Sequence, residues 1–302
     1  MTATEIQIDG QTFPAQDGEY VLDVARRNGI FIPALCAHPL LKPYGACRLC
    51  LVEIQQGKRR RMVASCAYPV QAGLVVRTAT DKISELRRGI VELLLARCPD
   101  SPPVRELARR LGVSESRFPT LYRAGEKCIL CGLCVRVCHE LVGAAAISFV
   151  SRGKERRVDS PFALGSEDCL GCCACVAVCP ADAIAVRSDA DTLNLMPFNN
   201  SVKMERCAKC GKPIAPLPLL ALIRSRLSLQ EPDRDGFHSD PDLIKEDGDA
   251  VERVPAGVAG AIHNQKIAAS SFFLAKNLCA DCRLERSAQA LAAVAAQQRR
   301  AS

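Results

Sequence analysis

Alternating apolar and polar residues predict a small strand-rich domain at the start of the chain. Strand-like segments lie at residues 5–8, 49–55, 61–65 and 74–78. Asp9-Gly10, directly after the first segment, is a typical hairpin turn. Apolar residues at helical spacing predict a helix over 20–28, with Gly29 as its stop. Two strands, a helix and further strands together predict a β-grasp fold over residues 1–80.

Helical periodicity follows this domain. Apolar residues recur at helical spacing over 80–96, and Thr80 or Asp81 can cap the helix. The face predicted to be apolar consists of Ile83, Leu86, Ile90, Leu93 and Leu94. A second, shorter helix is expected over 102–111, capped by Ser101.

The pattern is weaker in the last third of the chain. Residues 187–206 are expected to form a linker or long loop, and 217–227 a helix. Residues 230–266 are acidic and rich in Pro, Gly and Asp, which predicts a long loop or disorder. An Ala-rich helix is expected over 291–298.

Cysteine is the unusual feature of the composition, with 18 among 302 residues. The N-terminus has neither the basic nor the apolar region of a secretory signal, and no apolar run reaches the roughly 18 residues of a membrane helix. We therefore expect a cytoplasmic chain without direct membrane insertion. Because disulfides are rare in that compartment, metal ligation is the better interpretation of the cysteines.

The net charge of +7 is unevenly distributed, since residues 231–253 hold nine acidic and only three basic side chains. A basic body can bind nucleic acid. Here the Lys and Arg residues are dispersed and aromatics make up only 4% of the chain. We expect no nucleic-acid partner, and interpret the basic charge as a solvated surface or a face for an acidic protein.

The first cysteine group lies inside the strand-rich domain and consists of Cys36, Cys47, Cys50 and Cys66. Four thiolates on loops and strands suit a [2Fe–2S] cluster. Ten residues separate the first two cysteines, whereas four separate them in plant-type ferredoxins. The spacing therefore indicates a β-grasp [2Fe–2S] domain of a different type from the plant ferredoxins. Zinc is the alternative metal for this group.

The second group is two similar motifs, CILCGLCVRVC at 128–138 and CLGCCACVAVC at 169–179, which agree at six of eleven positions. This is the run of a bacterial two-cluster ferredoxin, in which the fourth cysteine of each motif ligates the other cluster. One [4Fe–4S] cluster is assigned to Cys128, Cys131, Cys134 and Cys179. The other is assigned to Cys138, Cys169, Cys172 and Cys175. The stretch between the motifs, around Arg152–Lys154, is expected to be an inserted hairpin.

The third group is a pair of CxxC knuckles, Cys207 with Cys210 and Cys279 with Cys282. Two such knuckles supply the four sulfurs of a structural zinc site. We expect one Zn²⁺, with another iron–sulfur centre or no metal as the alternatives.

The other candidate residues are interpreted as packing or surface groups. Cys98 and Cys173 are expected to be bystanders. His38 lies two residues from Cys36 and either tunes that cluster by a hydrogen bond or is an ordinary surface or packed histidine. The sequence contains no glycine-rich dinucleotide or phosphate motif, so no nucleotide or flavin site and no substrate site is expected.

The segments GACRLCLVEI at 45–54 and CILCGLCVRVC at 128–138 resemble the N-terminal iron–sulfur region of the large subunit of complex I. They also resemble the short diaphorase iron–sulfur subunit of NAD-linked hydrogenases and formate dehydrogenases. The resemblance covers roughly residues 1–190. It implies a series of clusters that passes electrons from a flavin and NAD(P)H module to a catalytic or quinone-facing module.

Two departures from those relatives are visible. They carry a further cluster, with a His-x3-Cys-x2-Cys-x5-Cys motif, after the long helix. Here that segment has one cysteine, Cys98, and no histidine, so the cluster is expected to be absent. The C-terminal knuckles are an addition that the resemblance does not explain.

These observations predict an α+β electron-transfer subunit of an oxidoreductase complex, with one [2Fe–2S] cluster, two [4Fe–4S] clusters and one zinc. Its partners are expected to be a flavin/NAD(P)H-binding subunit and a catalytic subunit such as a hydrogenase, formate dehydrogenase or related reductase. A free-standing ferredoxin carrier and a redox-sensing regulatory protein are the alternatives. The expected parts are a [2Fe–2S] domain over 1–80, a helical linker over 81–125, a ferredoxin-like domain over 126–190 and a metal-binding region over 200–290.

Overall fold

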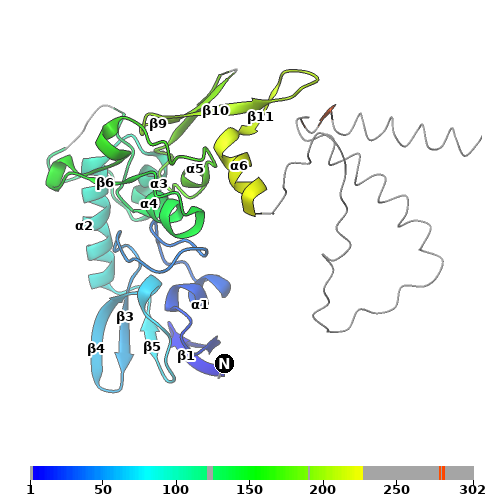
Figure 1. Cartoon of the computed structure of the whole chain (residues 1–302). Helices are drawn as coiled ribbons and strands as arrows, with labels where there is room; N and C mark the ends of the chain where they lie inside the picture. The colour runs from blue at the N-terminus through cyan, green and yellow to red at the C-terminus, as the bar shows by residue number, and fades with distance from the viewer. Residues whose placement is uncertain (1–2, 121–124, 190, 227–278, 280, 283–302) are drawn as a thin grey trace, which may run out of the picture. The chain divides into compact units, whose positions relative to one another are not determined.

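The computed structural model describes residues 3–120, 125–189, 191–226, 279 and 281–282 (Figure 1). The predicted acidic loop over 230–266 and the predicted helix over 291–298 lie outside the described residues. The chain divides into two compact units, one of residues 1–187 with 194–200, and one of residues 188–193 with the residues from 201 onward.

The N-terminal part is a five-stranded sheet with one helix, α1 (Val21–Arg27). Its strands are β1 (Ala3–Ile8), β2 (Gln11–Gln16), β3 (Leu51–Gln56), β4 (Arg59–Ala64) and β5 (Val75–Arg77). The order is β2-β1-β5-β3-β4, with β1 and β5 parallel and the other pairs antiparallel. This confirms the predicted β-grasp fold. Ile6, Ile8 and Val76 of the sheet pack with Val21 and Leu22 of α1 in one core.

The turns of this domain follow the expected chemistry. Asp9 and Gly10 join β1 to β2 with φ of 49° and 86°, a conformation that favours Asn, Asp and Gly. A short 3₁₀ turn, η1 (Ser65–Ala67), follows β4 and contains Cys66. The loop between α1 and β3 holds the other three cysteines of the first group.

Two helices follow, α2 (Asp81–Arg97) and α3 (Pro102–Arg110). The Thr80 hydroxyl caps α2 by accepting a hydrogen bond from the Ile83 N–H. The predicted cap at Ser101 is only partly right. Ser101 occupies the cap position of α3, but its hydroxyl makes no capping bond and is buried with no hydrogen-bond partner in the described part of the chain.

The apolar face predicted for α2 needs correction. Ile83 is buried, but Leu86 and Leu93 are 39% and 54% exposed. Two charged residues, Arg87 and Glu92, are buried in their place. Both find polar partners in other segments, so the buried face of α2 is set by tertiary contacts as well as by apolar periodicity.

The segment with the two central cysteine motifs contains short elements only. They are α4 (Leu133–Arg136), the π-helical turn η2 (Val137–Val142), β6 (Ser148–Val150), the 3₁₀ turns η3 (Gly153–Glu155) and η4 (Pro161–Ala163), β7 (Arg157–Asp159) and α5 (Ala174–Ala177). β6 and β7 pair antiparallel, so the predicted hairpin between the motifs is confirmed.

The expectation of a linker or loop over 187–206 is wrong. The strands β8 (Ala185–Ser188), β9 (Thr192–Met196), β10 (Asn200–Arg206) and β11 (Pro213–Pro216) form a sheet of order β11-β10-β9-β8. The inward residues Leu193, Leu195 and Val202 are buried, and they provide the period-two pattern that the polar composition conceals. The predicted helix after this sheet is present as α6 (Leu217–Arg226).

Candidate cluster and metal sites

The first cysteine group is gathered at one end of the N-terminal sheet. Cys36, Cys50 and Cys66 are buried and Cys47 is half-buried. The Cys47 backbone N–H donates a hydrogen bond to the Cys36 sulfur over 3.3 Å. Gly45, with φ of 69°, shapes the turn that brings this amide to the sulfur.

The four thiols of this group are close enough to interact with one another. Hydrogen bonds from the Cys47 and Cys66 thiols lower the pKa of Cys36 to about 2. A bond from Cys66 lowers the pKa of Cys50 to about 6. The same contacts raise the pKa of Cys47 and Cys66. Four converging sulfurs with a backbone amide aimed at one of them form a donor set that suits an iron–sulfur cluster.

One cavity, of about 460 Å³, has four cysteines in its wall: Cys128, Cys131, Cys134 and Cys179. Three come from the first central motif and the fourth from the second. The Ala183 N–H donates to the Cys179 sulfur over 3.4 Å. Burial raises the pKa of the Cys131 thiol to about 11. A neutral thiol is favoured there until a positive metal centre stabilises the thiolate.

Gly132 is the turn residue of this site. Its φ is 78°, and a Cβ at this position would lie 3.2 Å from Phe149 Cζ and 3.5 Å from Tyr44 Cε1. A side chain here would therefore be strained by the backbone and crowded by two rings.

A second, smaller cavity is lined by the other five cysteines of the central motifs: Cys138, Cys169, Cys172, Cys173 and Cys175. Burial raises the pKa of Cys175 to about 12. Asn200, at the start of β10, is 2% exposed and accepts the Ser166 N–H over 2.8 Å. Its side chain also hydrogen-bonds Cys169 and works to lower the pKa of that thiol, although burial dominates and raises it.

Asn200 was missed in the sequence because it lies far from both motifs in the chain. An asparagine within a strand is unfavourable without a specific partner, and this was the available signal.

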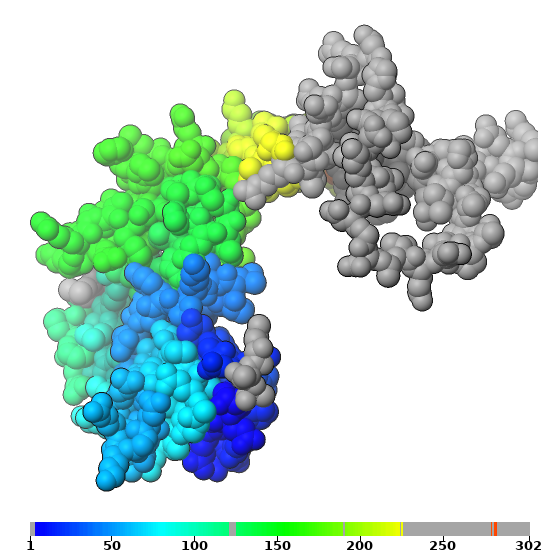
Figure 2. All heavy atoms as spheres, turned by 60° about the horizontal axis from the view of Figure 1, so that its bottom comes forward, coloured from blue at the N-terminus to red at the C-terminus, as the bar shows by residue number. Residues whose placement is uncertain are grey.

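The first cysteine group and cysteines from the walls of both cavities border one apolar cluster. Its buried members are Cys36, Leu41, Cys131, Leu133 and Val137, and the half-buried side chains packed on it include Cys47 and Cys175. Figures 1 and 2 show the loop before β3 lying between the N-terminal sheet and the central motifs. Arg136 ties the same parts together, because it donates to the Lys42 carbonyl and stacks 5.2 Å from the Tyr44 ring.

The third group also comes together. The sulfurs of Cys207, Cys210, Cys279 and Cys282 all lie within 4.8 Å of one another. Lys212 and Asp281, one beside each knuckle, form an ion pair at 3.4 Å. Burial works to raise the pKa of Cys207, but backbone N–H groups of Cys279, Cys210 and Lys209 lower it to about 6. Such amides stabilise thiolates, the form that binds metal.

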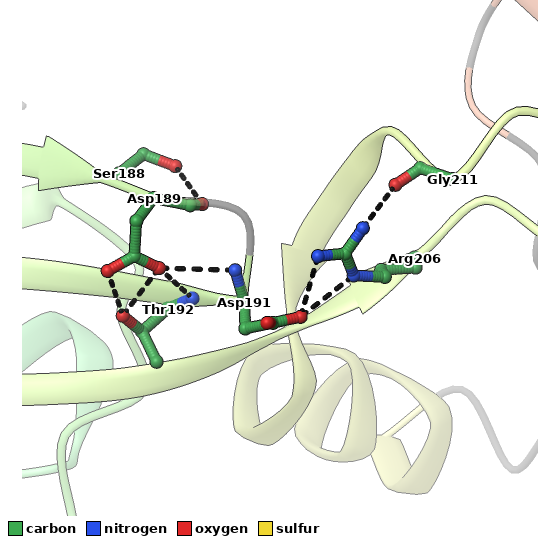
Figure 3. A network of polar contacts seen from close by, with 6 residues as sticks. All are labelled: Ser188, Asp189, Asp191, Thr192, Arg206 and Gly211. Carbon is green, nitrogen blue, oxygen red and sulfur yellow. Dashed lines mark hydrogen bonds and ion pairs between the residues drawn. The ribbon is translucent and has the colours of Figure 1, made fainter.

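A polar network fixes the first of these knuckles (Figure 3). The Arg206 guanidinium donates to the Gly211 carbonyl over 3.0 Å and pairs with Asp191 at 2.7 Å. Next to it, the Thr192 hydroxyl donates to both carboxylate oxygens of Asp189. Arg206 therefore links the turn after Cys210 to the β8–β9 turn.

The remaining candidates are placed as packing groups. Cys98 is fully buried, its thiol donates to the Leu94 carbonyl over 3.1 Å, and burial raises its pKa to about 12. Cys173 is half-buried and itself lines the second cavity. His38 Nδ1 accepts the Leu40 N–H, so this nitrogen caps a local turn. Among the described helices, none is long and apolar enough to cross a membrane.

Two family descriptions match the chain. Residues 2–81 match the "2Fe-2S iron-sulfur cluster binding domain", and residues 127–183 match the "4Fe-4S dicluster domain". The first covers the β-grasp sheet with its four cysteines, and the second covers both central motifs.

Curated relatives match over 58% to 61% of the chain. An NADH-quinone oxidoreductase subunit of Rhizobium meliloti is 34% identical over 204 residues, 60% of this chain and 24% of the relative. The alpha subunit of the NADPH-Fe(3+) oxidoreductase of Geobacter sulfurreducens is 34% identical over 197 residues, 58% of this chain and 23% of the relative. A subunit of the NADP-reducing hydrogenase of Solidesulfovibrio fructosivorans is 32% identical over 213 residues, 61% of this chain and 36% of the relative.

The matched part thus spans about a quarter to a third of the length of these relatives. A chain in the crystal structure of an NAD+-reducing [NiFe]-hydrogenase is 32% identical, covering 52% of this chain and 74% of that chain, with a TM-score of 0.47. The protein therefore contains a 2Fe-2S cluster binding domain and a 4Fe-4S dicluster domain, and its homologues are subunits of NADH- and NADPH-linked oxidoreductases and hydrogenases.

Proposed function

We propose that this chain is the electron-transfer subunit of a multi-subunit oxidoreductase. The observation that carries the proposal is the shared apolar cluster, which places cysteines of the first group and of both cavity walls in one apolar region. When bound, the iron–sulfur clusters accept and donate single electrons. The chain holds the sulfurs, keeps water away from them and aims backbone amides at them.

The ligand assignment follows the cavities. Cys36, Cys47, Cys50 and Cys66 hold the [2Fe–2S] cluster. Cys179 joins the first three cysteines of the first central motif, and Cys138 joins the first three of the second motif. This crossed assignment is supported by the two cavity walls, because Cys179 of the second motif lies in the first wall and Cys138 of the first motif lies in the second.

The same contacts support an order for electron transfer. Cys36 and Cys131 are buried in one apolar cluster, and the half-buried Cys175 packs against the same cluster. The first [4Fe–4S] cluster therefore lies between the [2Fe–2S] cluster and the second [4Fe–4S] cluster in the order of electron transfer. Its ligands are Cys128, Cys131, Cys134 and Cys179.

We further propose that the partners are a flavin/NAD(P)H-binding subunit and a catalytic oxidoreductase subunit in the cytoplasm. The names of the relatives support this, since they combine NADH or NADPH with a quinone, iron or hydrogenase reaction. The chain itself supplies no substrate site in this scheme.

The C-terminal knuckles hold one Zn²⁺ with a structural role, because four thiolates give zinc a closed and redox-silent site.

Purification from the native cell under anaerobic conditions tests the proposal. An obligate subunit brings stoichiometric partners, one of which contains flavin. The isolated, reconstituted chain should be reduced by dithionite and should not oxidise NADH with a dye acceptor. A chain that purifies without partners would be a free carrier, and turnover of NADH by the chain alone would contradict the proposal.

A further inference from the structure

Arg87 is a buried cation in the middle of α2, and it lies beside the first cysteine group. It is 6% exposed. Its Nε donates to the Leu49 carbonyl over 3.0 Å and its Nη2 donates to the Leu51 carbonyl over 2.8 Å. These two residues flank Cys50, so the guanidinium is hydrogen-bonded to the backbone on both sides of this cysteine.

The charge of Arg87 has no close partner in the described part of the chain. No carboxylate there lies within ion-pair distance of the guanidinium, and its two hydrogen-bond acceptors are neutral carbonyls. Asp9 interacts only electrostatically, and both of its carboxylate oxygens accept hydrogen bonds from Thr78. A buried charge is costly unless an opposite charge compensates it.

We propose that Arg87 is the counter-ion of the [2Fe–2S] cluster and raises the reduction potential of that cluster. The inference rests on the proposed function. Four thiolates and two sulfides outweigh the charge of two irons, so the cluster is an anion, and reduction makes it more negative. A fixed cation beside Cys50 stabilises the reduced form more than the oxidised form. Arg87 acts on the cluster by its charge, which its hydrogen bonds to the Leu49 and Leu51 carbonyls hold beside Cys50.

The α2 helix offers a matched control. Arg88 is the next residue of the helix and carries the same charge, but its side chain is exposed. Water screens a charge there, so its effect on a buried cluster is small. R87Q and R88Q remove the same charge from adjacent positions and differ only in burial and contacts.

The test is an anaerobic redox titration of the full-length protein, with the EPR signal of the binuclear cluster as readout. R87Q should shift the reduction equilibrium of this cluster toward the oxidised form by about tenfold, or about 59 mV for one electron. R88Q should leave it within about twofold of the wild type. R87K keeps the charge, so it should lie nearer the wild type than R87Q does.

The outcomes separate the inference from the proposed function. A wild-type protein without a binuclear signal contradicts the function itself. A wild-type signal whose potential is the same in R87Q, or is lowered equally by R87Q and R87K, contradicts only the counter-ion role. If R87Q fails to hold the cluster, retention in R87K supports the role of charge. Loss in both variants overturns it, since the hydrogen bonds to Leu49 and Leu51 would then be the essential feature.

Discussion

Cys36 and Cys131 lie in the same apolar cluster, 1% and 7% exposed, although one belongs to the β-grasp domain and the other to the first central motif. Leu41 and Leu133 fill the same cluster. Low dielectric around the sulfurs strengthens the effect of every nearby charge and amide on the clusters that they hold. In the proposed function, the packing between the first cysteine group and the first central motif is therefore part of the electron path.

The proposed crossed ligation of the two [4Fe–4S] clusters predicts the effect of Cys179→Ser. Although Cys179 belongs to the second motif, this variant should damage the cluster held by Cys128, Cys131 and Cys134. EPR of the dithionite-reduced variant measures which signal is lost. Cys173→Ser is the matched control, because Cys173 is also in the second motif but is not assigned as a ligand, and both signals should survive. Loss confined to the cluster of Cys169, Cys172 and Cys175 would refute the crossed assignment.

The C-terminal knuckles predict the metal content. Elemental analysis of protein purified anaerobically should give about ten iron atoms and one zinc per chain. The reason is that the four sulfurs of this group lie within 4.8 Å of one another, which suits the four-sulfur coordination of a structural zinc. A value near fourteen iron atoms without zinc would mean that the knuckles hold a third [4Fe–4S] cluster and that the electron path extends into this region.

Arg206 should stabilise the proposed zinc site through its bonds to Gly211 and Asp191. R206Q should release zinc to a chelator about tenfold faster than the wild type does. Residues that hydrogen-bond metal ligands typically change metal affinity by about 10- to 100-fold. The low end of that range is expected here because the Arg206–Asp191 pair is partly exposed. D191N should also speed zinc release, but by less than R206Q does. The effect of the double variant should be smaller than the sum of the two single effects. K203Q, an exposed change on the same strand, is the control. Equal release from all four proteins would show that the network does not support the knuckle.

Cys98 should behave as a packed thiol. With a pKa of about 12, roughly one molecule in ten thousand carries the thiolate at pH 8, and the sulfur is fully buried. Iodoacetamide at pH 8 should therefore not label it in the native holoprotein, and should label it after unfolding. Peptide mass spectrometry reads the site directly. Rapid native labelling would place Cys98 in an exposed or activated environment and would contradict its packing.

Local patterns in the sequence were enough to predict the β-grasp domain. The Asp9-Gly10 turn, the apolar alternation of β1 and the cap at Thr80 all depend on neighbours in the chain, and each is where the pattern indicates. The cysteine groups were recognisable for the same reason, because ligand spacing within a loop is itself local.

The features that escaped prediction depend on distant contacts. β9 and β10 are short and largely polar, so their pairing decides their conformation more than their composition does. Arg87 lies among apolar positions of α2, and only the Leu49 and Leu51 carbonyls explain its burial. Asn200 gains its role from Ser166 and Cys169, which lie in a separate segment.

Quantitative EPR of the wild-type protein at liquid-helium temperature, after anaerobic reduction by dithionite, tests the central claim most directly. Three clusters that each accept one electron should give about three spins per chain. Because cysteines of neighbouring groups share one apolar cluster, the signals should also broaden one another when all three are reduced. One isolated spin, or fully reduced signals without mutual broadening, would contradict a continuous electron path through this chain.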